Sequence, residues 1–173
     1  MSLCGQKMNL RAIEPEDLEF LFEIENNEAI WEVSHTQVPF SKYVLKQYLE
    51  NAHLDIFETK QLRLLIEEKN TKNRMGMVDL FDFNPQHRRA GIGILVHPKF
   101  QKKGVASIAL EMIIRYAFSQ LNLHQLYANI ITNNKQSISL FKKNNFVMVG
   151  EKKDWILSNG AFKNEFLFQL INE

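Results

Sequence analysis

The chain contains a single cysteine, Cys4, among its 173 residues. An internal disulfide therefore cannot form, and Cys4 is expected to be an inert thiol, which suits a reducing cytoplasm. Basic and acidic residues are nearly balanced, 21 against 20, so no excess of charge favours nucleic acid or an anionic membrane as a partner. No apolar run approaches the roughly 20 residues of a membrane-spanning helix, and no signal peptide is expected before the fold.

Common nucleotide-binding and metal-binding motifs are also missing. A Walker loop requires lysine and then serine or threonine after its glycine, whereas Gly104 is followed by Val105. A dinucleotide fingerprint requires three spaced glycines after a strand, but Gly91 and Gly93 lie inside an apolar run. No metal is expected, because the histidines show no ligand spacing; they include His35, His53 and His124.

The most informative stretch of the chain runs from Ile92 to Ser107. An apolar strand ends at Pro98, which cannot donate to a strand ladder, and a polar turn then leads into an amphipathic helix. Gly104 in this turn allows a ligand to approach the backbone, and the helix start offers free N–H groups and a positive dipole end. The stretch therefore predicts a phosphate-binding turn. An ordinary strand–turn–helix junction with solvated lysines is the alternative interpretation.

Hydrophobic periodicity predicts a single domain over residues 1–173, in which strands alternate with helices. Strands are expected at 8–13, 62–68, 76–83, 89–96, 126–131, 146–157 and 162–171, and helices at 14–26, 41–57, from 105 and at 134–143. Residues 28–40 are expected to be irregular, and the helix at 41–57 is expected to point Val44, Tyr48 and Leu49 inward. The strands between 62 and 96 form an antiparallel meander, and the strand at 126–131 can lie parallel to its neighbour after a crossover.

This order of elements resembles that of the GCN5-related N-acetyltransferases (GNAT). Gln101–Ala106 has the spacing Gln-x-x-Gly-x-Ala of the family's pyrophosphate loop, and Asn134–Phe146 resembles its second cofactor segment. Asn145 stands where the family usually has glycine, and asparagine tolerates the left-handed conformation that closes a helix. The resemblance implies an α/β (α+β) fold of GNAT type, with a mixed, mostly antiparallel central sheet, helices on both faces and a splayed parallel strand pair.

A narrower resemblance is to the bacterial spermidine (diamine) N-acetyltransferases. It rests on Gly76–Phe83, on the His-Arg-Arg-Ala motif at His87–Ala90 and on Tyr116–Leu123. That subfamily usually has glutamate where Gly91 stands, and an acidic, aromatic segment in place of Ser34–Phe40. These two departures leave open which polyamine binds and whether an allosteric polyamine site exists.

The resemblance implies acetyl-coenzyme A as cosubstrate. Backbone groups of the splayed strand would pair with the pantetheine arm, and an N–H at Leu95 or Val96 would polarise the thioester oxygen. Gln101–Ala106 would surround the pyrophosphate, and Asn134 would bind the pantetheine arm, cap the next helix, or both. The implied cofactor-binding residues are Ile94, Leu95, Val96, Gln101, Lys102, Lys103, Gly104, Val105, Ala106, Asn134, Ser137 and Lys143.

Three further side chains are candidates for the chemistry. Phe141 stands where many family members carry a tyrosine that protonates the departing thiolate; a core aromatic is the alternative interpretation. Asp79 and Asp82 could bind the acceptor amine. Residues three apart on a strand face opposite sides unless a bulge intervenes, so Asp79 is expected in the cleft and Asp82 in solvent.

His87 and His97 could relay protons, but each is expected at the surface.

The single cysteine suits a cytoplasmic location, and the resemblance implies a homo-oligomeric acyltransferase that uses acetyl-coenzyme A. It would move the acetyl group directly to the primary amine of a small molecule, with a polyamine such as spermidine as the leading acceptor. Two alternatives remain: acetylation of the N-terminal amine of a ribosomal protein, and non-catalytic binding of acetyl-coenzyme A by a sensor or scaffold. Neither nucleic acid nor a membrane is expected as a partner.

Overall fold

The computed structural model describes residues 3–34 and 36–172, so that His35 lies outside the described residues. The elements follow in the order β1 (Met8–Ala12), η1 (Pro15–Asp17), α1 (Leu18–Glu25), α2 (Glu28–Ser34), α3 (Lys42–Glu50), α4 (Ile56–Thr59), β2 (Leu62–Glu68), β3 (Arg74–Asn84), β4 (Arg89–Val96), η2 (Pro98–Phe100), α5 (Val105–Ser119), β5 (Gln125–Ile131), α6 (Lys135–Lys143), β6 (Val147–Ser158) and β7 (Ala161–Ile171). None of the helices in the described ranges is long and apolar enough to cross a membrane.

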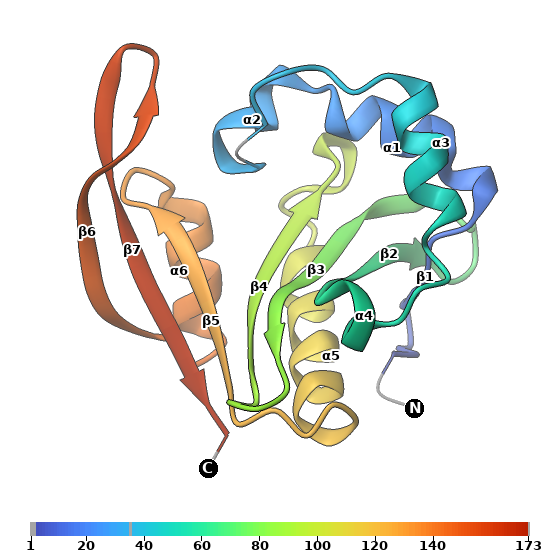
Figure 1. Ribbon diagram of the computed structural model, residues 1–173. Coiled ribbons are helices and arrows are strands. Elements are labelled where there is room, and N and C mark those ends of the chain that lie inside the picture. Colours follow the sequence, from blue (N-terminus) through green and yellow to red (C-terminus); the bar gives the residue numbers. More distant parts are fainter. Residues whose placement is uncertain (1–2, 35, 173) are drawn as a thin grey trace.

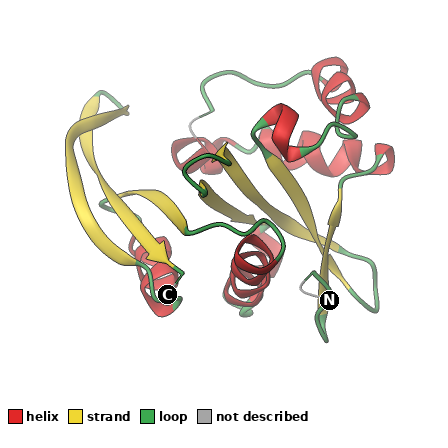
Figure 2. Cartoon of the chain, turned by 60° about the horizontal axis from the view of Figure 1, so that its bottom comes forward, coloured by secondary structure: helices red, strands yellow, loops and turns green. Residues whose placement is uncertain are grey.

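The strands of the described residues form one sheet in the order β1-β2-β3-β4-β5-β7-β6 (Figure 1). Every neighbouring pair is antiparallel except β4 and β5, which are parallel. Helices cover both faces of the sheet (Figure 2). Alternation along β3 explains this arrangement, because Val78 packs in the cluster that includes α5 whereas Met77 packs with α1 and α3. The predicted meander, crossover and mixed sheet are confirmed.

The prediction of an irregular segment at 28–40 was wrong over α2. Asn27 Oδ1 accepts a hydrogen bond from the N–H of Ala29 at 3.1 Å, near the start of the helix. Ile30 is buried against α1 and α3, and the indole N–H of Trp31 donates to the Glu25 carbonyl at 2.9 Å. The burial of Ile30 and the hydrogen bond of the Trp31 indole therefore stabilise this helix. The helix is too short to show a hydrophobic period in the sequence.

The single helix predicted at 41–57 is two helices, α3 and α4. Ser41 caps α3 as expected, but the helix ends at Asn51, and Asp55 starts α4 by accepting from the N–H groups of Phe57 and Glu58. Asparagine and aspartate offer the backbone local hydrogen bonds that compete with a continuous helix. The buried residues of α3 are Leu45 and Leu49, whereas the predicted Val44 is exposed and Tyr48 is partly buried.

The sheet opens between β4 and β5. These strands pair only where Arg89, Ala90 and Gly91 lie beside Gln125, Leu126 and Tyr127, and they separate beyond that row. β4 stays paired with β3 up to Val96, and β5 stays paired with β7 up to Ile131. The predicted splayed pair is confirmed, and the gap between the strands is where a ligand can reach free backbone groups.

A buried ion cluster ties the first strand and turn to the sheet. Asp17 is fully buried and accepts hydrogen bonds from Arg11 at 2.8 Å, Arg74 at 2.5 Å and the N–H of Glu14 at 2.8 Å. Burial by itself raises the pKa of Asp17, but the bonds from Arg11, Arg74 and Glu14 outweigh it and lower the pKa to about 2.

We expect Asp17→Asn to destabilise the fold by roughly 3 kcal/mol, because it leaves Arg11 and Arg74 without their shared carboxylate. The pKa of Asp17 is lower in the folded chain, so its contribution is complete above about pH 4 and is lost as the pH falls toward about 2. Denaturant unfolding at several pH values would test this. An Asp17→Asn loss that is unchanged between neutral and acidic pH would contradict the assignment.

Candidate functional site

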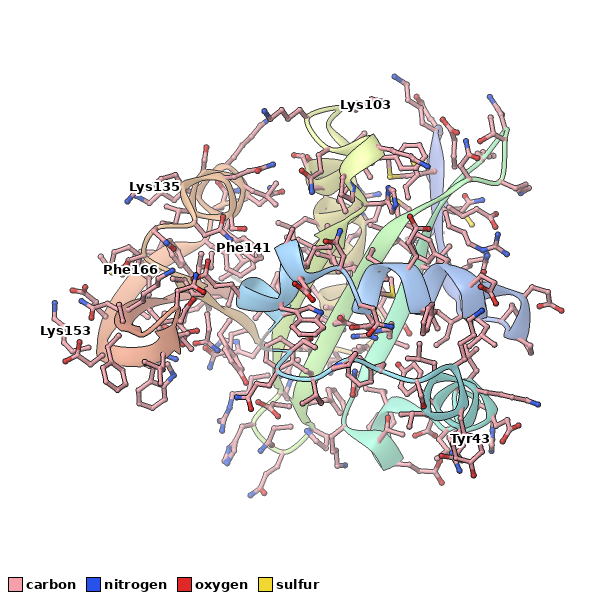
Figure 3. The ribbon with its side chains drawn as sticks, turned by 90° about the horizontal axis from the view of Figure 1, so that it is seen from above. Tyr43, Lys103, Lys135, Phe141, Lys153 and Phe166 are labelled. Carbon is pink, nitrogen blue, oxygen red and sulfur yellow. The ribbon has the colours of Figure 1, made fainter. Side chains whose placement is uncertain are left out.

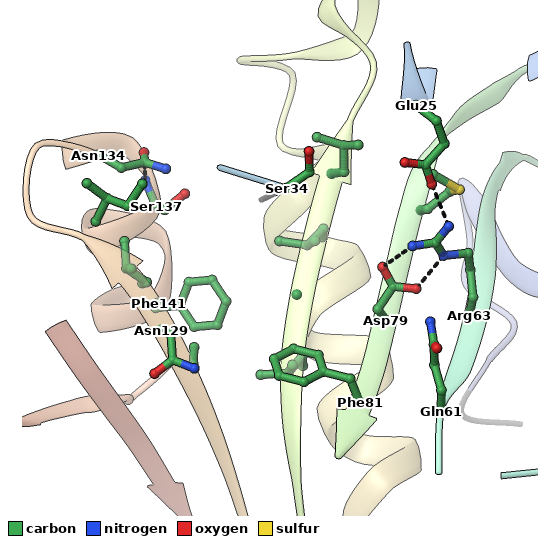
Figure 4. Close-up of a pocket in the computed structure, with 18 residues that line it drawn as sticks. Glu25, Ser34, Gln61, Arg63, Asp79, Phe81, Asn129, Asn134, Ser137 and Phe141 are labelled. Atoms are coloured by element: carbon green, nitrogen blue, oxygen red, sulfur yellow. Dashed lines mark hydrogen bonds and ion pairs between the residues drawn. The ribbon is translucent and has the colours of Figure 1, made fainter. Parts of the chain in front are cut away.

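A cavity of about 430 Å³ lies where β4 and β5 separate (Figure 4). One end is lined by α1, β2 and β3, the middle by β4, and the other end by β5 and α6. The polar and aromatic lining residues are Glu25, Ser34, Gln61, Arg63, Asp79, Phe81, Asn129, Asn134, Ser137 and Phe141. The cavity thus joins the predicted acceptor side and the predicted cofactor side of the chain.

The backbone of β4 offers hydrogen-bonding groups to this cavity. The N–H of His97 donates to Met75 on β3 at 2.9 Å, and the two strands remain in register from there to Gly91. In an antiparallel pair alternate residues bond to the partner, so Leu95 faces β3 with its backbone, whereas Ile94 and Val96 face the gap. The prediction for Leu95 is therefore corrected: its side chain lines the cavity, but its N–H does not point there.

The Gln101–Ala106 turn has the backbone shape of an anion site. Lys102 and Gly104 both have positive φ, 59° and 79°, and successive N–H groups in such turns form a concave cradle for anions. The first helical bond of α5 runs from Ile108 to Gly104, so the N–H groups before Ile108 have no helical acceptor. The Gln101 amide donates to the Val96 carbonyl at 3.0 Å, which braces the turn against β4.

The lysines of the turn lie at its surface. Lys102 and Lys103 are exposed, and Lys103 lies at the outer tip of the turn (Figure 3). The ammonium of Lys103 is 5.6 Å from the centroid of the Phe100 ring. Backbone N–H groups with two cations beside them suit an anionic ligand, and the predicted contact with the diphosphate of coenzyme A stays a prediction.

The start of α6 also faces the cavity. Asn134 Oδ1 accepts from the Ser137 N–H at 3.1 Å, so Asn134 is the helix cap, and both residues line the cavity. Asn145 has a φ of 66°, which confirms the left-handed conformation expected there. Lys143 is exposed at the far end of α6, roughly 13 Å along the helix from Asn134. It does not line the cavity, so the structure gives no support to its predicted cofactor contact.

Phe141 is both a core residue and a wall of the cavity. It is 4% exposed, and its ring meets Phe146 edge-on with 4.9 Å between centroids. The ring points from α6 toward the gap (Figure 4). The two interpretations made from the sequence are therefore compatible, and a hydroxyl added to this ring would extend from a rigid position.

Asp79 lies in the cavity as predicted, but it is paired within the protein. Arg63, its neighbour across β2 and β3, donates to both of its oxygens, at 2.6 and 3.1 Å. The remaining guanidinium arm donates to Glu25 at 2.5 Å, and the Tyr48 ring lies 5.7 Å from the guanidinium carbon. Burial by itself lowers the pKa of Arg63, but the charge of Asp79 raises it, so Arg63 stays charged. Two carboxylates and one guanidinium leave one negative charge.

Asp82 does not line the cavity, although the bulge that would change its direction does occur. The register of β3 and β4 shifts between Phe81 and Asn84, and Asp82 has a φ of 48°. Its carboxylate accepts from the Tyr127 hydroxyl at 3.0 Å. Burial and then this hydrogen bond raise the pKa of Tyr127 to about 12. Asp82 is exposed as expected, yet it has a structural partner on β5.

The prediction that His97 lies at the surface was wrong. His97 is 9% exposed, its Nε2 lies 3.0 Å from Glu23 Oε1, and its Nδ1 accepts from the Lys99 N–H. Phe20 and Phe100 pack beside its ring. His97 therefore connects α1 to the end of β4, whereas His87 is exposed as predicted.

Glu25 and Arg63 are the charged cavity residues that sequence reasoning missed. Arg63 interrupts the apolar run from Leu62 to Ile66, and that polar break was the available signal. Glu25 gave no comparable signal, since a glutamate at the end of a helix is ordinary. Only the approach of α1 to β2 brings the two together.

Comparison with known proteins agrees with this geometry. A family model described as an acetyltransferase (GNAT) domain matches residues 7–147. The chain is 30% identical to the spermidine N(1)-acetyltransferase of Escherichia coli K12 over 160 residues. This alignment covers 92% of this chain and 83% of that protein. Among solved structures, the spermidine N-acetyltransferase of Vibrio cholerae in complex with coenzyme A and spermine aligns with a TM-score of 0.88 and 27% identity, over 96% of each chain.

A dodecameric structure of the Vibrio cholerae spermidine N-acetyltransferase aligns with a TM-score of 0.81 and 28% identity, over 96% of this chain and 95% of that one. The family model spans more than half of the sequence. The chain belongs to the GCN5-related N-acetyltransferase (GNAT) family.

Proposed function

We propose that this protein transfers the acetyl group of acetyl-coenzyme A directly to the primary amine of a small molecule, with a polyamine such as spermidine as the leading acceptor. The observation that carries the proposal is the cavity itself, which has an excess of one negative charge at the end lined by Glu25, Arg63 and Asp79; the positive-φ turn that follows β4 supports the binding of an anionic cosubstrate. Direct transfer requires positioning and polarisation, and no covalent intermediate on the protein.

The charged end of the cavity suits a cation. Glu25 and Asp79 share Arg63, and the three side chains are only 11–22% exposed. A partly desolvated carboxylate pair attracts an ammonium more strongly than a surface acid does. The similarity to spermidine N-acetyltransferases supports the same class of acceptor.

An assay of coenzyme A release separates the proposal from its alternatives. The protein would be incubated with acetyl-coenzyme A and spermidine, with an alanyl peptide, or with neither. Release with spermidine supports the proposal, and release only with the peptide supports a ribosomal-protein type of acetylation. Tight binding of acetyl-coenzyme A without release in any arm would indicate a sensor or scaffold.

Asp79→Asn should raise the KM for the amine about tenfold or more while changing the KM for acetyl-coenzyme A little. The substitution removes one carboxylate and leaves Arg63 with Glu25 alone, so the cavity loses its negative charge. Asp82→Asn is the comparison and should raise the KM for the amine less, because Asp82 lies outside the cavity and accepts a hydrogen bond from Tyr127. Steady-state kinetics with both substrates varied would decide. Equal effects of the two variants would refute the role of Asp79.

We also propose that the protein is a cytoplasmic homo-oligomer. A dodecameric relative supports assembly, and the edge strand β6 with its partner β7 exposes apolar side chains suited to a protein contact. These residues are Val147, Met148, Val149, Trp155, Leu157, Phe162 and Ile171. The free, exposed Cys4 is compatible with a reducing compartment. Sedimentation of the purified protein would test the assembly.

A further inference from the structure

The ring of Phe81 crosses the sheet at the row where β4 and β5 separate. Phe81 on β3 is paired with Gly91 on β4, and Gly91 is paired with Tyr127 on β5. Paired residues of neighbouring strands point to the same face, so these three residues form one row on the face of the cavity. It is also the last row in which β4 and β5 are paired.

Gly91 makes the crossing possible. A Cβ at position 91 would lie 2.2 Å from Cε2 of Phe81, so the ring occupies the volume that any side chain there would need. Beyond Gly91 the ring meets Tyr127 edge-on, with 5.9 Å between centroids and 82° between planes. Phe81 therefore fills the place of the side chain that β4 lacks.

A hydrogen bond holds the far side of this row. The Tyr127 hydroxyl donates to Asp82, which follows Phe81 in the chain and lies in the bulge of β3. β3 therefore holds Tyr127 twice, through the Phe81 ring and through the Asp82 carboxylate. The row is a closed wall, which we call the Phe81 wall: Phe81, Gly91, Tyr127 and Asp82.

The cavity lies against this wall. Gly93, paired with Asp79 in the next row of the same face, has no side chain, and a Cβ there would lie 3.9 Å from the Phe81 ring. Phe81, Gly93 and Asp79 all line the cavity. An apolar ring thus closes the volume beside the charged pair of Asp79 and Arg63, at the foot of the gap between β4 and β5 (Figure 4).

We propose that Phe81 determines acceptor specificity by limiting how far the carbon chain of an amine can extend over Gly93 toward Gly91. The inference rests on the proposed acetyltransferase function and adds which amines it accepts. A phenyl ring offers no hydrogen bond and does not give way without loss of its contact with Tyr127. Short aliphatic amines and diamines are therefore favoured over acceptors whose chain must pass this wall.

Phe81→Ala should open the wall and shift selectivity toward longer acceptors. With a series of linear diamines of increasing length, the ratio of kcat/KM for long over short diamines should rise at least about tenfold, since room for one methylene is worth about that much. The KM for acetyl-coenzyme A should change little. Phe81→Leu, which keeps part of the apolar wall, should give an intermediate ratio. Phe57→Ala is the control, because Phe57 is an exposed phenylalanine on α4.

Gly91→Ala should have the opposite effect, because the new methyl group pushes the Phe81 ring into the cavity. The KM for every acceptor should rise, and combining Gly91→Ala with Phe81→Ala should relieve the increase. Thermal unfolding gives a second readout that needs no turnover. Gly91→Ala should lower the Tm by about 3–8 °C when Phe81 is present and by much less in Phe81→Ala.

The outcomes separate this inference from the proposed function. An active enzyme whose diamine ratio is unchanged in Phe81→Ala would overturn the specificity role alone. If Gly91→Ala lowers the Tm equally with Phe81 present and in Phe81→Ala, the Phe81 ring does not occupy the space above Gly91, and the Phe81 wall is refuted. If coupling in Tm is found but no amine is acetylated by any variant, the proposed function fails and the acceptor role fails with it.

Discussion

Replacing Gly104 with valine is expected to raise the dissociation constant for coenzyme A about a hundredfold. Gly104 has a φ of 79°, a conformation that costs a residue with a Cβ roughly 1–2 kcal/mol, and more for a β-branched one. Valine would also place methyl groups where the diphosphate approaches the N–H groups at the start of α5. The two effects add, because one disfavours the bound shape of the turn and the other obstructs the ligand.

The fold should survive this substitution, since no other atom lies within 4 Å of the position that a Cβ at Gly104 would take. Gly160 is a matched control. It has a φ of 76° and equally open surroundings, but it lies in the turn between β6 and β7. Gly160→Val should therefore lose stability without losing affinity for coenzyme A. Calorimetric titration of both variants measures the difference, and a folded Gly104→Val variant with unchanged affinity would exclude the turn as the phosphate site.

Phe141→Tyr is expected to increase kcat by about tenfold or more, provided that the new hydroxyl reaches the sulfur. General acid assistance is worth roughly a hundredfold to ten-thousandfold, and the native ring has no proton to donate. Phe141 is fixed between the cavity and Phe146, so a hydroxyl would be held with little freedom. Phe141→Leu is the control, since it changes the packing without adding a donor and should not raise kcat.

The native enzyme should nevertheless be active, though slow. A thiol titrates near about 8.5, so the thiolate is a tolerable leaving group, whereas an aliphatic amine loses its proton only near about 10. The amine proton is thus the larger obstacle, and kcat/KM should rise with pH as the neutral amine becomes more abundant. Rates equal to the uncatalysed reaction across the amine panel, with tight binding of acetyl-coenzyme A, would favour the sensor alternative.

Most of the fold could be predicted because its signals are local. The helix α5 has a clear 3.6-residue period after a glycine, and the strands β2, β3 and β4 are separated by short polar turns. The errors fell where local signals were weak or conflicting. α2 is stabilised by tertiary burial of Ile30, and the break between α3 and α4 depends on Asn51 and Asp55 competing with the helical backbone.

The cofactor side of the site could be predicted more fully than the acceptor side. The Gln101–Ala106 turn is contiguous in sequence, and the phosphate contact proposed for it would depend on its own backbone, so a short motif describes it. The acceptor end is assembled from α1, β2 and β3. Asp79 was identified, but its pairing with Arg63 and Glu25 depends on strand register and helix packing, which no local pattern encodes.

The sequence by itself determined the family, most of the element order, the glycine turn before α5 and the absence of a hydroxyl at Phe141. Each of these is a property of neighbouring residues or of residue identity. Only the tertiary structure decided which β4 backbone groups face the gap, that Asp79 is already neutralised in part, and that the Phe81 ring fills the space above Gly91. These three features depend on how the strands align and separate. A shift of one residue in strand register would move every side chain of that strand to the opposite face of the sheet.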